Sequence, residues 1–148
     1  RVALVSDAGT PSVSDPGFLL VRECLAKNIE VECLPGATSI IPALVNSGLA
    51  SDRFFFEGFL PRKKRRLTHL RTLATLEQTI ILFESPFRLM KTLEQLVEFM
   101  GSGRKACVCR ELTKIHEENV RGTLAEVISY FKEKKIKGEI VIVVEGKS

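Results

Sequence analysis

The chain opens on Val2-Ala3-Leu4-Val5 and continues with Ser6-Asp7-Ala8-Gly9-Thr10-Pro11-Ser12-Val13-Ser14-Asp15-Pro16-Gly17. The apolar run predicts a buried strand. The small and polar residues after it predict a loop that leads into a helix, with Asp15 as the capping residue and Pro16 at the first helical position. In open α/β sheets, ligands bind where such loops leave the carboxyl ends of the strands. The opening therefore predicts an α/β fold and a candidate binding loop.

A second loop of the same kind follows at Leu34-Pro35-Gly36-Ala37-Thr38-Ser39. In the first loop, Asp7 can accept two hydrogen bonds from a ligand, and Gly9 lets the backbone approach it closely. Taken alone, the first loop is equally consistent with a plain strand-to-helix turn. The pair of loops favours a binding site.

Strand and helix patterns alternate along the chain. The segment from Asn46 to Arg53 is polar and small, which places a domain boundary there and divides the chain into residues 1–51 and 52–148. Helices are predicted after Gly17, from Thr38 to Ser47, around Leu67–Ala74, around Leu89–Val97, and from a capping box at Thr123–Glu126 onwards. The predicted strands are Val2–Val5, Val31–Leu34, Phe54–Phe56, Thr79–Phe83, Ala106–Cys109, Asn119–Arg121 and Glu139–Val144.

Two of these strands are apolar on both faces. In Thr79–Phe83 and Ile140–Val144, apolar residues follow one another and do not alternate with charged or strongly polar residues. This pattern is typical of strands covered by helices on both sides. The fold class predicted from this pattern is α/β with a mostly parallel sheet.

Charge is unevenly distributed. The chain has 148 residues, of which 27% are charged and 45% hydrophobic. Residues 1–50 hold three basic and five acidic side chains, and the remainder holds nineteen and thirteen. This excess predicts an anionic partner that contacts residues 51–148. No apolar run approaches the roughly 20 residues of a membrane helix and no signal-peptide pattern opens the chain, so we expect a cytoplasmic protein without membrane contact.

The four cysteines are Cys24, Cys33, Cys107 and Cys109. Cys107 and Cys109 lack the two-to-four-residue gap of a zinc knuckle and would point the same way on a strand. Core packing is the expected role, with no metal and no disulfide.

Two basic segments stand out. Arg62, Lys63, Lys64, Arg65 and Arg66 follow Pro61 in what the pattern predicts as the first turn of a helix. Cations are unfavourable at that end of a helix, so contact with the phosphates of a partner is the preferred explanation over a solvated charge run. Lys132, Lys134, Lys135 and Lys137 lie near a predicted helix C-terminus, where cations are locally favourable, so a structural explanation is stronger there.

Charged residues also follow the predicted strands. Glu84 and Arg88 can pair four residues apart, and Arg110 and Glu111 end another strand. Each pair allows a structural ion pair or a ligand contact, while His116 fits a surface loop. Motifs for dinucleotide binding, P-loop phosphotransfer and hydrolase elbows are absent.

The two loops and several later motifs together resemble the small-subunit ribosomal RNA methyltransferase I group of the tetrapyrrole methylase-like superfamily. The matching later segments are Asp52–Pro61, Phe83–Arg88, Arg110–Lys114, Arg121–Leu124 and Lys137–Glu139. The resemblance implies two αβα domains, usually in a homodimer, with S-adenosylmethionine folded between them. It also implies transfer of a methyl group to the ribose 2′-hydroxyl of a cytidine in small-subunit ribosomal RNA, either naked or in the assembled subunit.

The resemblance also implies site residues. The second cofactor loop matches Asp7, Ala8, Gly9 and Thr10, and the third matches Thr38, Ser39 and Ile40. Candidate residues of the cleft are Glu84, Ser85, Arg88, Arg110 and Glu111, and no residue is singled out as the catalytic base. The group's leading Pro-Ile-Gly-Asn-Leu type loop and Glu-Asp-Thr-Arg segment do not occur here, so we expect an inactive fragment with only part of its first domain. Methylation of a tetrapyrrole ring carbon and a non-enzymatic RNA-binding module are the alternatives.

Overall fold

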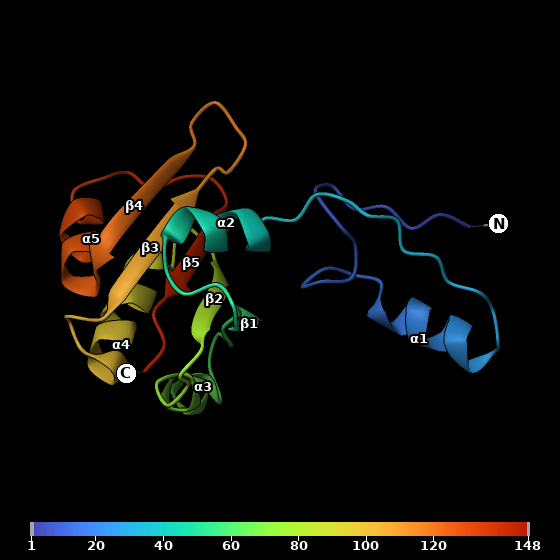
Figure 1. The fold of residues 1–148 in the computed structure, drawn as a ribbon, viewed down its shortest axis with the longest axis horizontal. Coiled ribbons are helices and arrows are strands. Elements are labelled where there is room, and N and C mark those ends of the chain that lie inside the picture. The colour runs from blue at the N-terminus through green and yellow to red at the C-terminus, as the bar shows by residue number, and fades with distance from the viewer. Residues whose placement is uncertain (1, 148) are drawn as a thin grey trace. The chain divides into compact units, whose positions relative to one another are not determined.

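A computed structural model describes residues 2–147 (Figure 1). The chain divides into two compact units, with the division between Ser39 and Ile40. The N-terminal unit contains one helix, α1 (Phe18–Ala26), between two irregular segments. Among the described residues, no helix is long and apolar enough to span a membrane.

Three local predictions for the N-terminal unit are wrong. Residues 2–5 and 31–34 are not strands, since a strand needs a hydrogen-bonded neighbour and neither segment pairs with another in the described chain. None of residues 2–39 is buried, so these apolar runs have no core to enter. The cap of α1 is Gly17 without a side-chain hydrogen bond, rather than Asp15.

The C-terminal unit is a five-stranded sheet with helices on both faces. The strands lie in the order β1-β2-β5-β3-β4. In chain order the elements are α2 (Ile40–Ser47), β1 (Phe54–Phe59), α3 (Arg66–Leu73), β2 (Thr79–Glu84), α4 (Leu89–Met100), β3 (Lys105–Arg110), β4 (Glu118–Thr123), α5 (Leu124–Phe131) and β5 (Ile140–Val144).

The expectation of a mostly parallel sheet is wrong. Only β1 and β2 pair in parallel, while β5 runs antiparallel to both β2 and β3, and β3 runs antiparallel to β4. The apolar faces of β2 and β5 indicated helices on both sides, and that part is confirmed. Cover by helices on both faces does not require parallel strands. Here the last strand, β5, lies in the middle of the sheet, antiparallel to both of its neighbours, and is still covered on both faces.

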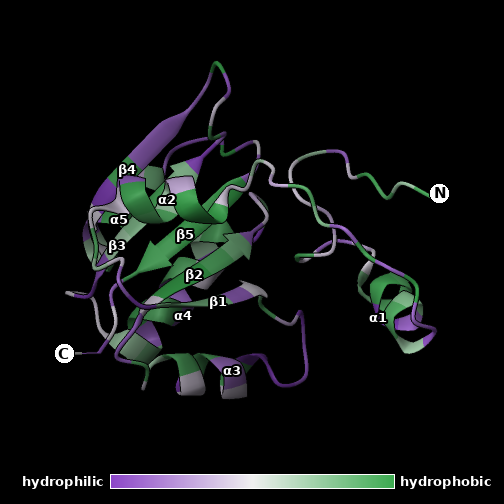
Figure 2. Ribbon diagram, turned by 45° about the vertical axis from the view of Figure 1, so that its right-hand side comes forward, coloured by the Kyte–Doolittle hydropathy of each residue, from purple (hydrophilic) through white to green (hydrophobic). Residues whose placement is uncertain are grey.

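The core has two layers that alternate along the strands. Ile80, Leu82 and Ile142 face α3, α4 and α5, whereas Ile81 and Val143 face α2. Figure 2 shows the central strands β2 and β5 in the hydrophobic colour. The unit is therefore an αβα sandwich, as the sequence predicted.

Cys107 and Cys109 belong to the α2 side of this core. Both are buried, with their Sγ atoms 3.6 Å apart and unoxidised. The hydrogen bond with Cys107, together with burial, raises the pKa of the Cys109 thiol. Their predicted role in core packing is confirmed, and the described residues contain no group of three side chains suited to a metal ion.

Helix α2 packs on the sheet of the C-terminal unit. Ala43 and Leu44 are buried there, and Cys109 donates to the carbonyl of Ala43 at 3.8 Å. The domain boundary at residues 51 and 52, which assigns α2 to the first domain, stays a prediction.

Helix α5 begins with the predicted capping box. The Thr123 hydroxyl accepts from the Glu126 amide at 3.3 Å, and the Glu126 carboxylate accepts from the Thr123 amide at 2.7 Å. Replacing Thr123 with alanine should lower the free energy of unfolding by about 0.5–2 kcal/mol, since one helix-end amide loses its acceptor. Urea unfolding would measure the loss, and Thr123→Ser is the matched control that keeps the hydroxyl. Equal stability of the alanine and serine variants would show that the cap contributes nothing.

Candidate functional site

The two loops predicted to bind a cofactor contact each other in the N-terminal unit. The Thr10 amide donates to the Ala37 carbonyl at 2.9 Å, and the Thr10 hydroxyl donates to the same oxygen at 3.2 Å. The loops that contain Asp7–Thr10 and Thr38–Ser39 are therefore held together, although no sheet lies behind them in residues 2–39.

Gly9 makes this contact sterically possible. Its φ is 74°, and a Cβ at this position would lie 2.9 Å from the Ala37 oxygen. A side chain would both strain the backbone and push the loops apart. The contact between the loops therefore explains why the motif has glycine at this position. The backbone at Ala8 and Gly9 stays exposed.

Asp7 has an available carboxylate. It is exposed, and within residues 2–147 its side chain has no hydrogen-bond or ion-pair partner. The Ser6 hydroxyl fixes the turn behind it by donating to the carbonyls of Ala8 at 3.1 Å and Gly9 at 2.9 Å. An ionised carboxylate on a fixed turn can accept two hydrogen bonds from hydroxyl or amine groups. In the other loop Ser39 is exposed, and Ile40 begins α2 in the C-terminal unit.

In the C-terminal unit, the candidate cleft residues gather at one end of the sheet. Strand register places both Glu84 of β2 and Arg110 of β3 opposite Ile140 of β5. Ser85 and Glu111 directly follow these strand ends. The sequence placed these residues after separate strands, and the inserted strand β5 aligns them.

Glu84 is the centre of a buried ionic network. Its side chain is 1% exposed and receives Arg88 at 2.7 Å, with Arg66 at 3.8 Å. The Thr92 hydroxyl and the Ser85 amide donate to it at 2.6 and 2.7 Å. Of the two interpretations of the Glu84–Arg88 pair, the structure shows the ion pair.

Arg110 and Glu111 are also engaged in ion pairs. Arg110 contacts Glu118 at 3.0 Å and donates to the Lys137 carbonyl at 3.3 Å. Glu111 accepts from Lys114 at 3.0 Å and from the Glu139 amide at 2.9 Å. That amide, followed by Lys114, lowers the pKa of Glu111.

Glu118 and Tyr130 are partners that the sequence did not single out. Tyr130 donates its hydroxyl to Glu118, and the Lys134 ammonium lies 3.4 Å from the centre of the Tyr130 ring. Burial alone would raise the pKa of Glu118, but the hydrogen bonds from Tyr130 and Arg110 and the charge of Lys134 lower it. Glu118 and Lys134 line a pocket of about 410 Å³ together with Arg110, Glu111, His116, Lys135 and Lys137.

The first basic segment lies in a turn and not in a helix. Arg62 to Arg65 are exposed and precede α3, with Arg65 in the left-handed region at φ 71°. We call these four residues the basic turn. The expectation that they form the first helical turn is wrong, although Arg65 is the N-cap residue of α3 and still lies at the helix end where a cation is unfavourable.

Arg66 differs from the basic turn because it points into the protein. It is 6% exposed and donates to Gln95 at 2.8 Å, to Thr92 at 2.7 Å and to the Pro61 carbonyl at 3.2 Å. Burial lowers the pKa of Arg66, and the charge of Glu84 opposes that shift. With its donors occupied inside the protein, Arg66 is not available for a phosphate.

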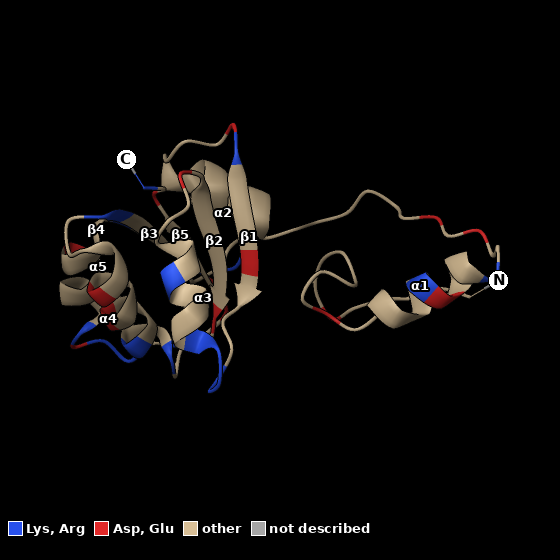
Figure 3. Cartoon of the chain, turned by 90° about the horizontal axis from the view of Figure 1, so that it is seen from below, with Lys and Arg blue, Asp and Glu red and all other residues tan. Residues whose placement is uncertain are grey.

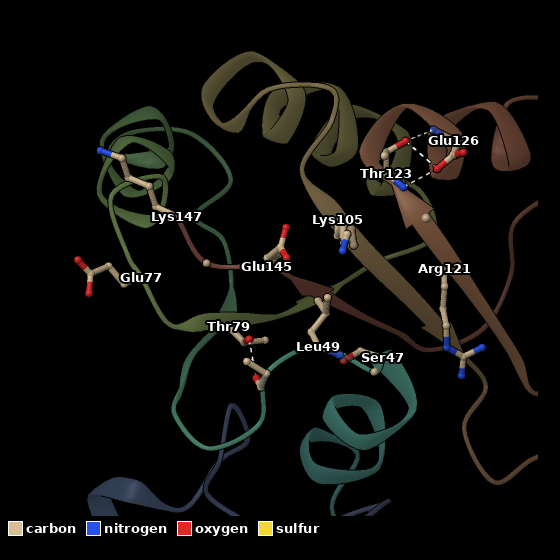
Figure 4. A pocket seen from close by; sticks show the side chains of 15 residues that line it. Ser47, Leu49, Glu77, Thr79, Lys105, Arg121, Thr123, Glu126, Glu145 and Lys147 are labelled. Carbon is tan, nitrogen blue, oxygen red and sulfur yellow. Dashed lines mark hydrogen bonds between the residues drawn. The ribbon is translucent and has the colours of Figure 1, made fainter.

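A second pocket, of about 570 Å³, lies at the opposite end of the sheet (Figure 4). Lys105, Arg121 and Glu145 come from three strand ends around it. The Arg121 side chain donates to the Asn46 carbonyl at 2.6 Å. Sequence reasoning missed this pocket: Arg121–Leu124 matched a family segment, but nothing in the sequence indicated that it lies beside the strand ends at Lys105 and Glu145.

Three comparisons with known proteins identify the family. The model of the tetrapyrrole (corrin/porphyrin) methylases matches residues 1–128. A protein of Synechocystis sp. named ribosomal RNA small subunit methyltransferase I is 56% identical over 99% of this chain and 53% of its own length. A protein of the same name from Thermotoga maritima is 46% identical over 99% of this chain and 66% of its own length. The chain spans about half to two thirds of the length of these relatives.

Solved structures agree at the level of the fold. The methyltransferase CobJ covers 93% of this chain with a TM-score of 0.69 and 21% identity, over 62% of its own length. Uroporphyrin-III C-methyl transferase from Thermus thermophilus, complexed with S-adenyl homocysteine, covers 94% of this chain and 63% of its own, with a TM-score of 0.60 and 20% identity. The matched residues, the αβα sandwich and the paired glycine-containing loops lead to one assignment: the chain belongs to the tetrapyrrole (corrin/porphyrin) methylase family.

Proposed function

We propose that the full-length protein transfers a methyl group from S-adenosylmethionine to the ribose 2′-hydroxyl of a cytidine in small-subunit ribosomal RNA. The observation that carries this proposal is the identity of 46–56% with ribosomal RNA small subunit methyltransferase I proteins over 99% of the chain. Related structures with tetrapyrrole substrates in their names are only about 20% identical, which supports a shared fold and no more.

The loops of the N-terminal unit fit such a cofactor. The exposed Asp7 carboxylate can accept hydrogen bonds from its hydroxyl or amine groups, and Gly9 lets the two loops pack closely next to it. When bound, S-adenosylmethionine supplies an electrophilic methyl group on a sulfonium. The residues of this chain hold and orient the cofactor, because alignment of the reacting atoms supplies much of the rate enhancement in a direct displacement.

The basic turn supports an RNA substrate over a tetrapyrrole. Its four cations are exposed, and none of them forms an ion pair within residues 2–147. A small macrocycle needs no such extended positive surface, whereas an RNA backbone does. The sequence leaves both naked RNA and the assembled subunit open as the form of the substrate. The homodimer and the cytoplasmic location stay predictions.

Mass spectrometry of ribosomal RNA tests the proposed function. Cells that lack the full-length protein should lose one ribose methyl group on a cytidine of the small-subunit RNA, and a plasmid copy should restore it. Identical modification patterns with and without the protein would contradict the proposal. Methylation of a corrin or porphyrin by the purified protein would favour the tetrapyrrole alternative.

Replacing Asp7 with alanine should weaken the binding of S-adenosylmethionine by the full-length protein. Loss of a charge-assisted hydrogen bond costs about 1–3 kcal/mol, or roughly 5- to 150-fold in affinity. Isothermal calorimetry would measure the change, with Asp15→Ala as the matched control because Asp15 is equally exposed on the same unit. Equal affinities of the Asp7 variant and the wild type would remove Asp7 from the site.

A further inference from the structure

Phe87 is an exposed aromatic residue with no role in packing. Its side chain is 96% exposed, in the turn between β2 and α4. An aromatic side chain left in water forgoes the favourable burial that its size offers. Its position on the surface therefore suggests a partner with an aromatic or apolar face.

The turn that carries Phe87 is held firmly. The Arg88 amide donates to the Ser85 carbonyl at 2.9 Å, and the Phe87 amide donates to the Ser85 hydroxyl at 3.3 Å. Glu84 binds both the Ser85 amide and the Arg88 side chain. The exposed ring thus stands on a preorganised turn, so a ligand does not have to order the backbone before it binds.

Cations flank Phe87 on both sides at the same end of the sheet. The basic turn follows the end of β1. On the other side, Lys132, Lys135 and Lys137 are exposed between α5 and β5, and none of them forms an ion pair in the described chain. In Figure 3, the blue segments before α3 and after α5 lie along the same lower edge.

The spacing suits an extended polyanion. From β1 to β3 the sheet order gives three strand steps, or about 14 Å at about 4.8 Å per step. Arg110, at the end of β3, binds the Lys137 carbonyl, so the last residue of the lysine segment lies near that strand. Two cationic segments with an aromatic ring between them are the arrangement by which proteins bind single-stranded nucleic acid, with phosphates on the cations and a base on the ring.

We infer that a single-stranded stretch of RNA crosses this end of the sheet and stacks one base on Phe87. The basic turn contacts phosphates on one side of that base, and Lys132, Lys135 and Lys137 contact phosphates on the other. This inference rests on the proposed function, and it assigns to Phe87 and the lysine segment a role in holding the RNA strand.

The first test uses a fluorescent single-stranded oligoribonucleotide of about 12 nucleotides, within the range of known single-strand sites. With the full-length protein, Phe87→Ala should weaken binding by about 5- to 150-fold, as loss of a stacked base does. Phe87→Tyr should keep most of the affinity. The slope of log affinity against log salt should not change, since no charge is removed.

Matched controls define the contact as stacking. Phe54→Ala removes an aromatic that is 39% exposed at the opposite end of β1, and it should leave RNA affinity unchanged. Probes with a single abasic nucleotide at successive positions should bind the wild type less well at one position, and at that position the Phe87→Ala variant should show no further loss. If Phe87→Ala lost as much affinity for a fully abasic probe as for the normal oligoribonucleotide, the stacking assignment would be overturned.

The second test replaces Lys132, Lys135 and Lys137 together with glutamine. This variant should lower the salt slope, by about 0.7 for each lost phosphate contact, and keep the effect of Phe87→Ala. If the wild type shows no salt-dependent RNA affinity, the proposed function itself fails. If it binds RNA and neither the Phe87→Ala nor the lysine variant differs from it, only this inference is overturned.

Discussion

Replacing Glu84 with alanine should lower the free energy of unfolding by about 3–5 kcal/mol, the cost of removing one partner from a buried ion pair. Glu84 is the one carboxylate that both Arg66 and Arg88 contact in the described chain. Without it, the buried Arg66 keeps a charge that water cannot reach, because a guanidinium does not release its proton near neutral pH. The Thr92 hydroxyl loses its acceptor as well.

Chemical denaturation followed by circular dichroism would measure this loss. Glu94→Ala is the matched control, because Glu94 lies exposed on α4 and its removal should change stability by no more than about 0.5 kcal/mol. Glu84→Gln keeps a hydrogen-bond acceptor and should fall between the wild type and the alanine variant. A Glu84→Ala protein as stable as the Glu94→Ala protein would show that the network contributes no net stability.

The same network should control the basic turn. Arg66 binds the Pro61 carbonyl at 3.2 Å, and Arg88 binds the Leu60 carbonyl at 3.4 Å. Both anchors depend on Glu84, so the chain just before the basic turn is tied to the end of β2. This link explains why the buried Arg66 directly follows the four exposed cations of the basic turn. By binding the Pro61 carbonyl, Arg66 fixes the backbone at the start of that turn.

Local patterns predicted local structure well. The capping box at Thr123 and the helical spacing in α4 depend on residues three or four apart, so the sequence contains them in full. The αβα layering could also be predicted, because a strand that is apolar on both faces needs cover on both. The antiparallel insertion of β5 could not be predicted, because the spacing of residues within a strand does not indicate which distant strand it pairs with.

The N-terminal unit shows the limit of reading strands from apolar runs. Val2–Val5 has the composition of a buried strand, yet it pairs with nothing in residues 2–39. Loop composition was more informative there, because Gly9 and Thr10 indicated a loop with close backbone contacts, although their partner Ala37 lies in the second loop. The network around Arg110 was missed because its partner Glu118, and Tyr130 which binds Glu118, belong to other elements and carry no motif.

Replacing Arg62, Lys63, Lys64 and Arg65 with glutamine should weaken RNA binding by the full-length protein to a similar extent for all RNA sequences. Phosphate contacts are independent of sequence, and each one lost lowers the salt slope by about 0.7 for single-stranded RNA, so four give about 3. Affinities at several salt concentrations would measure the change. Arg66 stays in this variant because it is buried and supports the fold.

Controls distinguish the three explanations of the basic turn. Lys105→Gln with Lys147→Gln removes two exposed cations at the opposite end of the sheet and should leave the salt slope almost unchanged. The melting temperature of the quadruple variant should match the wild type, since the four side chains make no ion pairs in the described chain. A lower melting temperature would indicate a structural role instead. Unchanged affinity and slope would make the turn a solvated charge run, and would remove the main observation in this chain that favours RNA over a tetrapyrrole.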